Sequence, residues 1–182
     1  MSEALGQGSV EQRLAALEKE LAKARDCARS LSIVVFSGEF DKLYAAFTIA
    51  TGAVCMSIKV DMFFTFWGAH AITPIIGKHE PKGFLERAFG WVMPKGMGRL
   101  PLSRKNFWGL GPKLMRILMR RKNIESLESL VENARDLGVK FHLCDTSASM
   151  MGLELCLGEG TNCCGVSTFL SNAMESKVVL FI

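Results

Sequence analysis

The chain has 182 residues, of which 49% are hydrophobic and 22% are charged. These values are typical of one globular domain with a sizeable core, and they exclude an intrinsically disordered chain. The two longest uncharged stretches, Leu43–Ile58 and Met62–Gly77, are shorter than the roughly 18–20 apolar residues needed to span a bilayer.

The net charge of +4 is unevenly spread. The Met-rich segment Lys78–Lys122 carries 12 basic and 2 acidic residues, whereas the rest of the chain carries 10 basic and 16 acidic residues. Such a basic block indicates either a docking surface for an acidic protein, a membrane surface or nucleic acid, or a solvated loop without a partner. It contains few aromatic residues and no RNA-binding signature, so we expect no nucleic-acid partner.

Six cysteines occur in the chain: Cys27, Cys55, Cys144, Cys156, Cys163 and Cys164. Residues 1–13 lack the basic and apolar regions of a secretory signal, so we expect a cytoplasmic protein with free thiols. The spacings contain no two CxxC pairs, which argues against a zinc ribbon. No GxGxxG or phosphate loop follows a predicted strand, so we expect neither metal nor cofactor.

The N-terminal segment, residues 1–30, is predicted to be an amphipathic helix. Its apolar residues alternate in steps of four and three, which is a heptad pattern about three heptads long. They are Val10, Leu14, Leu17, Leu21, Ala24, Ala28 and Leu31. This helix either mediates oligomerisation or caps its own domain.

The first half of the domain, which covers residues 31–182, alternates strand and helix. Leu31–Phe36 is a short apolar run that fits a strand buried on both faces. Asp41 is a suitable cap for a helix that continues to about Ser57, and Val60–Phe66 is the second predicted strand. Beyond it, a helix is expected at Phe84–Trp91 and a loop at Met93–Phe107, and long loops of this kind often bind ligands or close over sites.

The second half continues the alternation. Helices are expected at Pro112–Lys122 and Ile124–Leu137, with Gly138 as a natural residue after the second helix. Later elements are a third strand at Val139–Cys144, helices at Ser147–Leu155 and Gly165–Ser176, and a last strand at Lys177–Ile182. This pattern predicts a three-layer α/β domain with a parallel sheet of flavodoxin or Rossmann type and an N-terminal helical extension.

Ligands of parallel α/β sheets bind beyond the carboxyl ends of the strands, near the switch in strand order. Three loops leave those ends in this chain: SGEFDK, FWGAH and CDTS. The residues that we expect to line a site there are Ser37, Gly38, Asp41, Lys42, Trp67, Gly68 and Ser147.

Cys144 is the candidate nucleophile because it lies where a strand ends and a helix begins. A helix N-terminus or a cation lowers the pKa of a thiol, although the carboxylate of Asp145 would oppose the thiolate. The alternative is a buried cysteine that acts as a small hydrophobic residue. His142 shares a strand face with Cys144, but no standard ligand spacing supports a metal site.

The other cysteines are ranked by their surroundings. Cys163 and Cys164 lie in the polar stretch EGTNCCGVS, where either one of them resolves a disulfide or accepts sulfur from Cys144, or both are structural. Cys156 follows the apolar LEL, so it is either a core residue or a further candidate for a second thiol. Cys55 is expected in the core, and Cys27 is expected to be inert.

The chain also resembles the DsrE/DsrF-like sulfurtransferase family, in its longer subgroup that occurs beside TusA-like carriers and rhodaneses. The segments that carry the resemblance cover almost all of residues 32–182. They are FSGEFDKLYAAFTIATGA, VDMFFTFWGAHAI, MPKGMGRLPL, KNIESLESLVENARDLGVKF, CDTSASMMG and GVSTFLSNAMESKVVLFI.

The resemblance implies a flavodoxin-like parallel sheet, homo-oligomers that are often trimers or hexamers, and sulfur handling. The family's sulfur-carrying cysteine maps onto Cys144, which would hold a persulfide or thiosulfonate and act as a carrier or a sulfurtransferase. The adjacent pair Cys163–Cys164 departs from the family pattern. Two alternatives stay open: an oligomeric adaptor that docks on membrane or acidic proteins through the basic segment, and a thiol redox protein.

Overall fold

The computed structural model describes residues 3–27, 29–72, 97, 100–104, 109–151 and 160–182. The helix expected at Phe84–Trp91 lies outside these residues, as does most of the loop expected at Met93–Phe107. The described helices are α1 (Glu3–Cys27), α2 (Phe40–Cys55), the 3₁₀ helix η1 (Phe66–Ala71), α4 (Leu110–Arg121), α5 (Leu127–Asp136), α6 (Asp145–Met151) and α7 (Val166–Met174).

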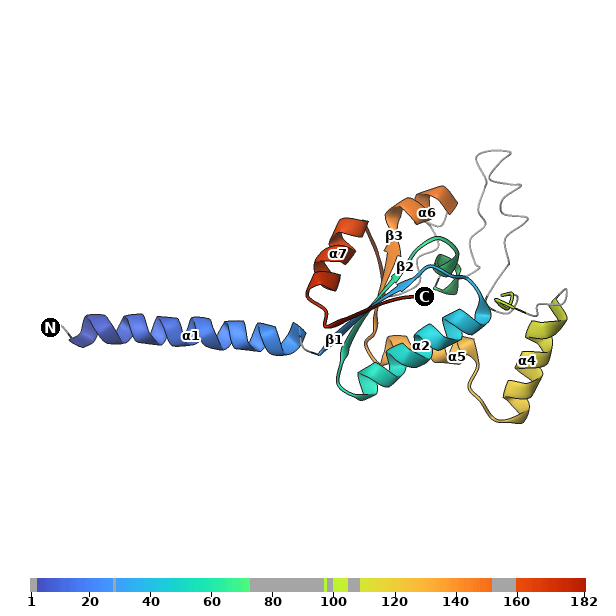
Figure 1. Cartoon of the computed structure of the whole chain (residues 1–182), viewed down its shortest axis with the longest axis horizontal. Helices are drawn as coiled ribbons and strands as arrows, with labels where there is room; N and C mark the ends of the chain where they lie inside the picture. The colour runs from blue at the N-terminus through green and yellow to red at the C-terminus, as the bar shows by residue number, and fades with distance from the viewer. Residues whose placement is uncertain (1–2, 28, 73–96, 98–99, 105–108, 152–159) are drawn as a thin grey trace.

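A parallel sheet with helices on both faces confirms the predicted α/β class (Figure 1). Its described strands are β1 (Ser30–Val35), β2 (Lys59–Phe64), β3 (Lys140–Cys144), β4 (Thr161–Cys164) and β5 (Val178–Phe181), in the order β4-β3-β2-β1-β5. All four neighbouring pairs are parallel. Strand β4 was not predicted, because TNCC has neither an apolar run nor an alternating pattern.

The alternation of side chains along each strand separates the two faces of the sheet. On one face, strand residues such as Phe64 and Phe141 join the large cluster under α2 and α5. On the other face, Phe63 and Cys144 join a small cluster with Phe169 and Ala173 of α7. The interior strand residues alternate between these two environments, and Cys144 belongs to the α7 face.

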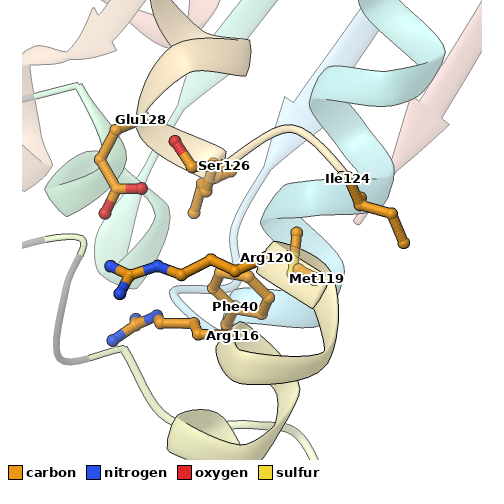
Figure 2. Close-up of a pocket in the computed structure, with 8 residues that line it drawn as sticks. Phe40, Arg116, Met119, Arg120, Ile124, Ser126 and Glu128 are labelled. Carbon is orange, nitrogen blue, oxygen red and sulfur yellow. The ribbon is translucent and has the colours of Figure 1, made fainter. Parts of the chain in front are cut away.

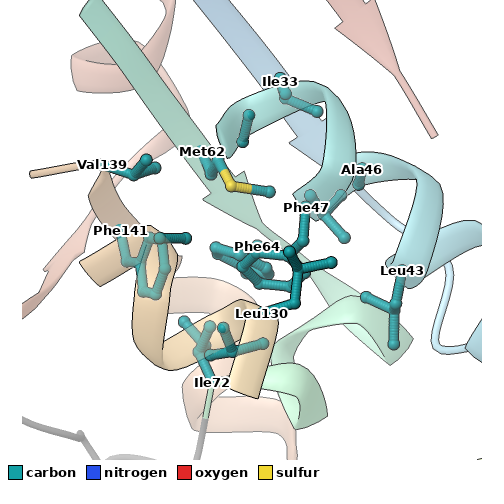
Figure 3. Close-up of a cluster of buried hydrophobic side chains, with 14 of the residues drawn as sticks. Ile33, Leu43, Ala46, Phe47, Met62, Phe64, Ile72, Leu130, Val139 and Phe141 are labelled. Carbon is teal, nitrogen blue, oxygen red and sulfur yellow. The ribbon is translucent and has the colours of Figure 1, made fainter. Parts of the chain in front are cut away.

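The core under α2 and α5 is built around three aromatic rings (Figure 3). Phe47 of α2 packs on Phe64 and Phe141, with ring centroids 5.9 and 5.8 Å apart, and Phe64 meets Phe141 edge-on at 5.5 Å. All three side chains are essentially inaccessible to solvent. Burial of each ring contributes about 1.5–3 kcal/mol to folding, so this cluster fixes the positions of β2 and β3.

Several predicted element boundaries are corrected by the structure. Strand β2 ends at Phe64 rather than Phe66, and helix α6 begins at Asp145 rather than Ser147. Helix α2 begins at Phe40 with Glu39 at its N-cap, so Asp41 lies in the first turn and is not the cap. Asp41 instead accepts hydrogen bonds from the backbone and side chain of Ser103. Helix α5 begins three residues later than predicted, because Ser126 is its N-cap and accepts a hydrogen bond from the Ser129 backbone N–H.

The switch in strand order lies between β1 and β5, from which the chain progresses in opposite directions across the sheet. Cys144 follows β3, which is two strands away from β1. Cys144 therefore lies at the carboxyl end of a strand, as its sequence position predicted, but not beside the switch in strand order.

Helix α1 extends away from the α/β domain (Figure 1). Four residues of its heptad pattern are exposed in the single chain: Val10, Leu14, Leu17 and Leu21. Among the described residues, no helix is both long enough and apolar enough to cross a membrane.

Candidate functional site

Cys144 is the last residue of β3, and α6 begins at the next residue. Its side chain is 3% exposed and lies in the small cluster beneath α7. The strand is extended at this point because β3 pairs on both sides, with β2 and β4. The backbone then turns directly into a helix, so the sulfur lies close to the first polar groups of α6.

Hydrogen-bond donors surround the Cys144 sulfur. Burial disfavours the thiolate, but hydrogen bonds from the side chain and backbone of Ser147, the hydroxyl of Thr65 and the backbone of Thr146 outweigh it. Together they hold the pKa of Cys144 below its ordinary value. A thiol stabilised in this way has a larger nucleophilic fraction at neutral pH and is a better leaving group.

Ser147 links the ends of two strands. Its hydroxyl lies 2.9 Å from the hydroxyl of Thr65 and accepts a hydrogen bond from the Phe66 backbone N–H at 3.0 Å. Phe66 has a φ of 45°, in the left-handed region that non-glycine residues seldom occupy. Residues in this conformation persist where their surroundings fix them. Here the hydrogen bond to Ser147 joins the loop after β2 to α6.

The loops after β1 and β2 are in direct contact. A Cβ atom on Gly68 would lie 2.2 Å from the Val35 carbonyl oxygen, and one on Gly38 would lie 2.6 Å from the Trp67 carbonyl oxygen. Neither position tolerates a side chain without movement of the backbone. Gly68 N–H also donates to the Phe36 carbonyl at 3.0 Å, so these glycines fix the loop that carries Thr65.

Some of the predicted site residues form contacts elsewhere. Lys42 pairs with Glu39 at 2.6 Å, and Ser37 donates to the same carboxylate at 2.6 Å. Asp41 is bonded to Ser103. Of the predicted lining residues, Ser147 contacts Cys144 directly, and Gly68 supports the loop of Thr65. Thr65 and Phe66 were missed because they were assigned to the end of the predicted strand Val60–Phe66, whereas β2 ends at Phe64.

Cys164 is the in-register neighbour of Cys144 across the parallel strands β3 and β4. It is half-buried and packs against the same small cluster as Cys144. Burial is the main cause that raises the pKa of Cys164, and the nearby groups Cys163, Asp145 and Cys144 add to it. The carboxylate of Asp145 therefore disfavours the thiolate of Cys164.

The remaining cysteines are placed as follows. Cys163 is exposed and is in register with Leu143, so it lies on the opposite face of β4 from Cys164. Cys55 is exposed at the end of α2, which contradicts its predicted burial, because this last turn of the helix extends past the core. Cys156 and the side chain of Cys27 lie outside the described residues.

His142, the other polar residue of β3, pairs with Asp61 across the α7 face. Its Nε2 atom lies 3.0 Å from the Asp61 carboxylate, and both side chains are largely buried. The pair joins β2 to β3 rather than contacting the sulfur. Among the described residues, no three His, Cys, Asp or Glu side chains gather where they could hold a metal ion.

A cavity of about 340 Å³ lies between α4 and the N-terminal ends of α2 and α5 (Figure 2). Its lining includes Phe40, Arg116, Arg120 and Glu128, and none of the predicted site residues. Arg116 lies over the Phe40 ring and donates to the Met97 carbonyl at 2.8 Å. The cavity is thus separate from the environment of Cys144.

Comparison with known proteins identifies the family. A model of the DsrE/DsrF/DrsH-like family matches residues 28–181, which include the whole sheet and the described helices except α1. The chain belongs to the DsrE/DsrF/DrsH-like family. This result confirms the resemblance found in the sequence.

Two relatives and one solved structure are similar to this DsrE-like chain. The uncharacterized protein YrkE of Bacillus subtilis (strain 168) is 40% identical over 152 residues, which are 83% of this chain and 95% of YrkE. The sulfur carrier protein DsrE2 of Allochromatium vinosum is 26% identical over 161 residues, 85% of this chain and 98% of DsrE2. The YchN protein of E. coli has 12% identity and a TM-score of 0.49, covering 85% and 99% of the two chains.

Proposed function

We propose that this protein carries sulfane sulfur on Cys144, as a persulfide or a thiosulfonate, and delivers it to a partner thiol. The observation that carries the proposal is the polar setting of Cys144 at the end of β3, beside the hydroxyls of Ser147 and Thr65, which lie 2.9 Å apart. The polar groups of Ser147, Thr65 and Thr146 lower the pKa of Cys144 despite its burial and so favour its thiolate. The similarity to DsrE2, a sulfur carrier protein, supports the same role.

The chemistry of the cycle needs no group beyond the thiolate and its donors. In loading, the Cys144 thiolate attacks the sulfane sulfur of a donor, a new S–S bond forms, and the donor's leaving group departs with the bonding electrons. In unloading, an acceptor thiolate attacks the outer sulfur and Cys144 leaves as a thiolate. The same hydrogen bonds stabilise the thiolate at both stages, so they favour transfer in either direction.

The partners that we propose are a TusA-like sulfur carrier or a rhodanese, and the assembly is a homo-oligomer. A persulfide survives only where oxidants are scarce, which agrees with a cytoplasmic location.

The test is the intact mass of the reduced protein after incubation with thiosulfate, tetrathionate or polysulfide. We expect an adduct that reductant removes and that is absent from Cys144→Ser. Cys55→Ser is the matched control, because Cys55 is an exposed thiol far along α2 from the site, and this variant should load normally. An adduct that persists in Cys144→Ser and disappears in another cysteine variant would refute the assignment.

A second candidate function is docking on a membrane through the basic segment, and the surface of α4 favours it. Its exposed apolar side chains are Leu110, Leu114, Met115, Ile117 and Leu118. Its basic residues are Lys113, Arg116, Arg120 and Arg121, and the helix contains no acidic residue. An exposed apolar stripe flanked by cations is typical of helices that lie on anionic membranes.

Vesicle co-sedimentation tests this alternative. We expect the wild-type protein to bind phosphatidylcholine vesicles that contain phosphatidylserine, and to be released by salt. Leu114→Glu with Ile117→Glu should abolish binding, whereas Leu137→Glu, an exposed change beyond α5, should not. Equal binding of all three proteins, or of pure phosphatidylcholine, would exclude α4 as the membrane-binding element.

A further inference from the structure

Cys144 and Cys164 form a pair that the sequence separates by twenty positions and the sheet brings side by side. They are directly in register across β3 and β4. In-register residues of parallel strands point to the same face, and the shared cluster with Phe63 and Phe169 confirms that both face α7. Cys163, in register with Leu143, faces the other way.

The two thiols differ in access. Cys144 is 3% exposed, so the thiol of a large partner cannot reach its sulfur without rearrangement of the surrounding chain. Cys164 is half-buried and lies on an edge strand of the described sheet, so it is more accessible than Cys144. We therefore propose, building on the function proposed above, that Cys164 is the exchange thiol that takes the sulfane sulfur from Cys144 and presents it to the acceptor.

The spacing of the strands brings the two thiols within reach of each other. Adjacent strands lie about 4.8 Å apart, and Cys144 and Cys164 are in register on the same face. A sulfane sulfur held by Cys144 adds one S–S bond of about 2.04 Å, so the outer sulfur can approach the thiol of Cys164.

The step is balanced without an added oxidant or reductant. The Cys164 thiolate attacks the outer sulfur of the Cys144 persulfide, an S–S bond forms at Cys164, and the bond to the Cys144 sulfur breaks. The bonding electrons leave with Cys144 as its thiolate, and the proton lost by Cys164 goes to solvent. The sulfane sulfur keeps its oxidation state.

The chemical environments of the two sulfurs set the direction. The hydrogen bonds of Ser147, Thr65 and Thr146 stabilise the departing Cys144 thiolate, and a leaving thiol of lower pKa departs faster. Burial and the charges of Cys163 and Asp145 make Cys164 the more basic sulfur, and a more basic thiolate is intrinsically more nucleophilic. Sulfur therefore moves outward, from the buried cysteine to the accessible one.

The experiment compares unloading to a small and a larger acceptor. Wild type, Cys164→Ser and the matched control Cys163→Ser are loaded with polysulfide, and the loss of sulfane sulfur to cyanide or to reduced glutathione is followed. Cys164→Ser should load on Cys144 and react with cyanide as wild type does, but transfer to glutathione at least about tenfold more slowly. Cys163→Ser should match wild type with both acceptors.

Localisation of the sulfur provides a second measurement that does not depend on the Cys164→Ser variant. Lys140 and Lys177 are the nearest tryptic sites, so trypsin leaves Cys144, Cys156, Cys163 and Cys164 in one peptide. Cleavage after Glu154, Glu159 and Glu175 separates them into three. In wild type that is alkylated after loading, the added sulfane sulfur should appear first in the peptide of Cys144 and then in the peptide of Cys163 and Cys164. In Cys163→Ser, the added sulfur should still reach that second peptide.

The outcomes separate the two proposals. If Cys144 does not load in wild type, the proposed function fails. If Cys144 loads but no label reaches Cys164, and Cys164→Ser unloads to glutathione at the wild-type rate, the function stands and the exchange role of Cys164 is refuted. An equal decrease in the rate of transfer to glutathione in Cys163→Ser and Cys164→Ser would also refute it, because only Cys164 of the two is in register with Cys144.

Discussion

The two faces of the sheet are built for different tasks. The face under α2 and α5 is closed by a large apolar cluster that centres on Phe47, Phe64 and Phe141. Among the described residues, the face under α7 has a small cluster, and it holds the pair His142–Asp61 and the thiols Cys144 and Cys164. One face therefore buries most of the described apolar core, and the other carries polar and reactive groups.

The largest expected effect on stability comes from substitution of two neighbouring phenylalanines, one on each face of the sheet. Phe64→Ala removes a fully buried ring from the α2 and α5 face and should cost about 3–5 kcal/mol of unfolding free energy. Phe63→Ala removes the ring that stacks on Phe169 with centroids 4.6 Å apart. Because Phe63 belongs to the smaller of the two clusters, Phe63→Ala should cost less, and urea unfolding of both variants measures the difference.

The alkylation rate of Cys144 should change more in Phe63→Ala than in Phe64→Ala, which is the opposite of the order expected for stability. Phe63→Ala opens space in the cluster that contains Cys144, so its alkylation by iodoacetamide should accelerate in the folded protein. Phe64→Ala should leave that rate unchanged under conditions where the protein stays folded. The same rate in both variants would show that the two faces are not independent.

Gly68→Ala addresses the contact that joins the β1 and β2 loops. Its Cβ would lie 2.2 Å from the Val35 carbonyl oxygen, so the loop carrying Thr65 must shift, at a cost of about 1–3 kcal/mol. Gly52→Ala is the matched control, because nothing lies within 4 Å of its Cβ in α2. It should stabilise the protein by about 0.5–1 kcal/mol. Thermal unfolding should therefore show a lower midpoint temperature for Gly68→Ala and a higher one for Gly52→Ala.

Much of this division could be predicted from the sequence. The apolar run Leu31–Phe36 identified an interior strand, because burial on both faces leaves a continuous hydrophobic signal. The β-type residues of Val139–Cys144 identified another. The position of Cys144 at a strand end followed from the same pattern. The family assignment rested on longer segments, including FFTFWG, which lie in β2 and η1.

The pairing of Cys144 with Cys164 could not be predicted. The strand Thr161–Cys164 is short, polar and at an edge, so it carries no burial signal, and without that strand no register could be assigned. Strand order is likewise not encoded in local pattern, so the separation of Cys144 from the switch in strand order could not be predicted either. The role of Thr65 depends on a side-chain contact across 82 positions, which periodicity does not report.

The pH dependence of stability tests whether the pKa of Cys144 is lowered in the folded protein. Its pKa in the folded protein lies below the ordinary value because its hydrogen bonds outweigh burial. The resulting stabilisation is lost as pH falls through the folded pKa, and it is complete above the unfolded pKa of about 8.5. The unfolding free energy of wild type relative to Cys144→Ser should therefore increase as pH rises toward that value. A difference that is constant with pH would contradict the lowered pKa.

Ser147→Ala tests the same hydrogen bonds through reactivity. It removes a donor to the Cys144 sulfur and the acceptor of the Phe66 N–H, so the thiolate fraction at neutral pH should decrease. One hydrogen bond contributes about 0.5–1.5 kcal/mol, which predicts alkylation that is roughly two- to tenfold slower. Ser171→Ala, which removes a hydroxyl bonded only within α7, should react at the wild-type rate. Both variants should converge with wild type at high pH.

The outer surface of α7 should contribute least to stability. Val166, Leu170 and Met174 lie four residues apart along the helix, and all three are exposed. Leu170→Glu with Met174→Glu should change the unfolding free energy of the monomer by no more than about 0.5 kcal/mol. If a second copy of the chain covers this face, the same variant should reduce the molar mass measured by light scattering. Unchanged mass and stability together would mean that α7 serves only to cover the thiols beneath it, and that self-association uses another surface, such as the exposed leucines of α1.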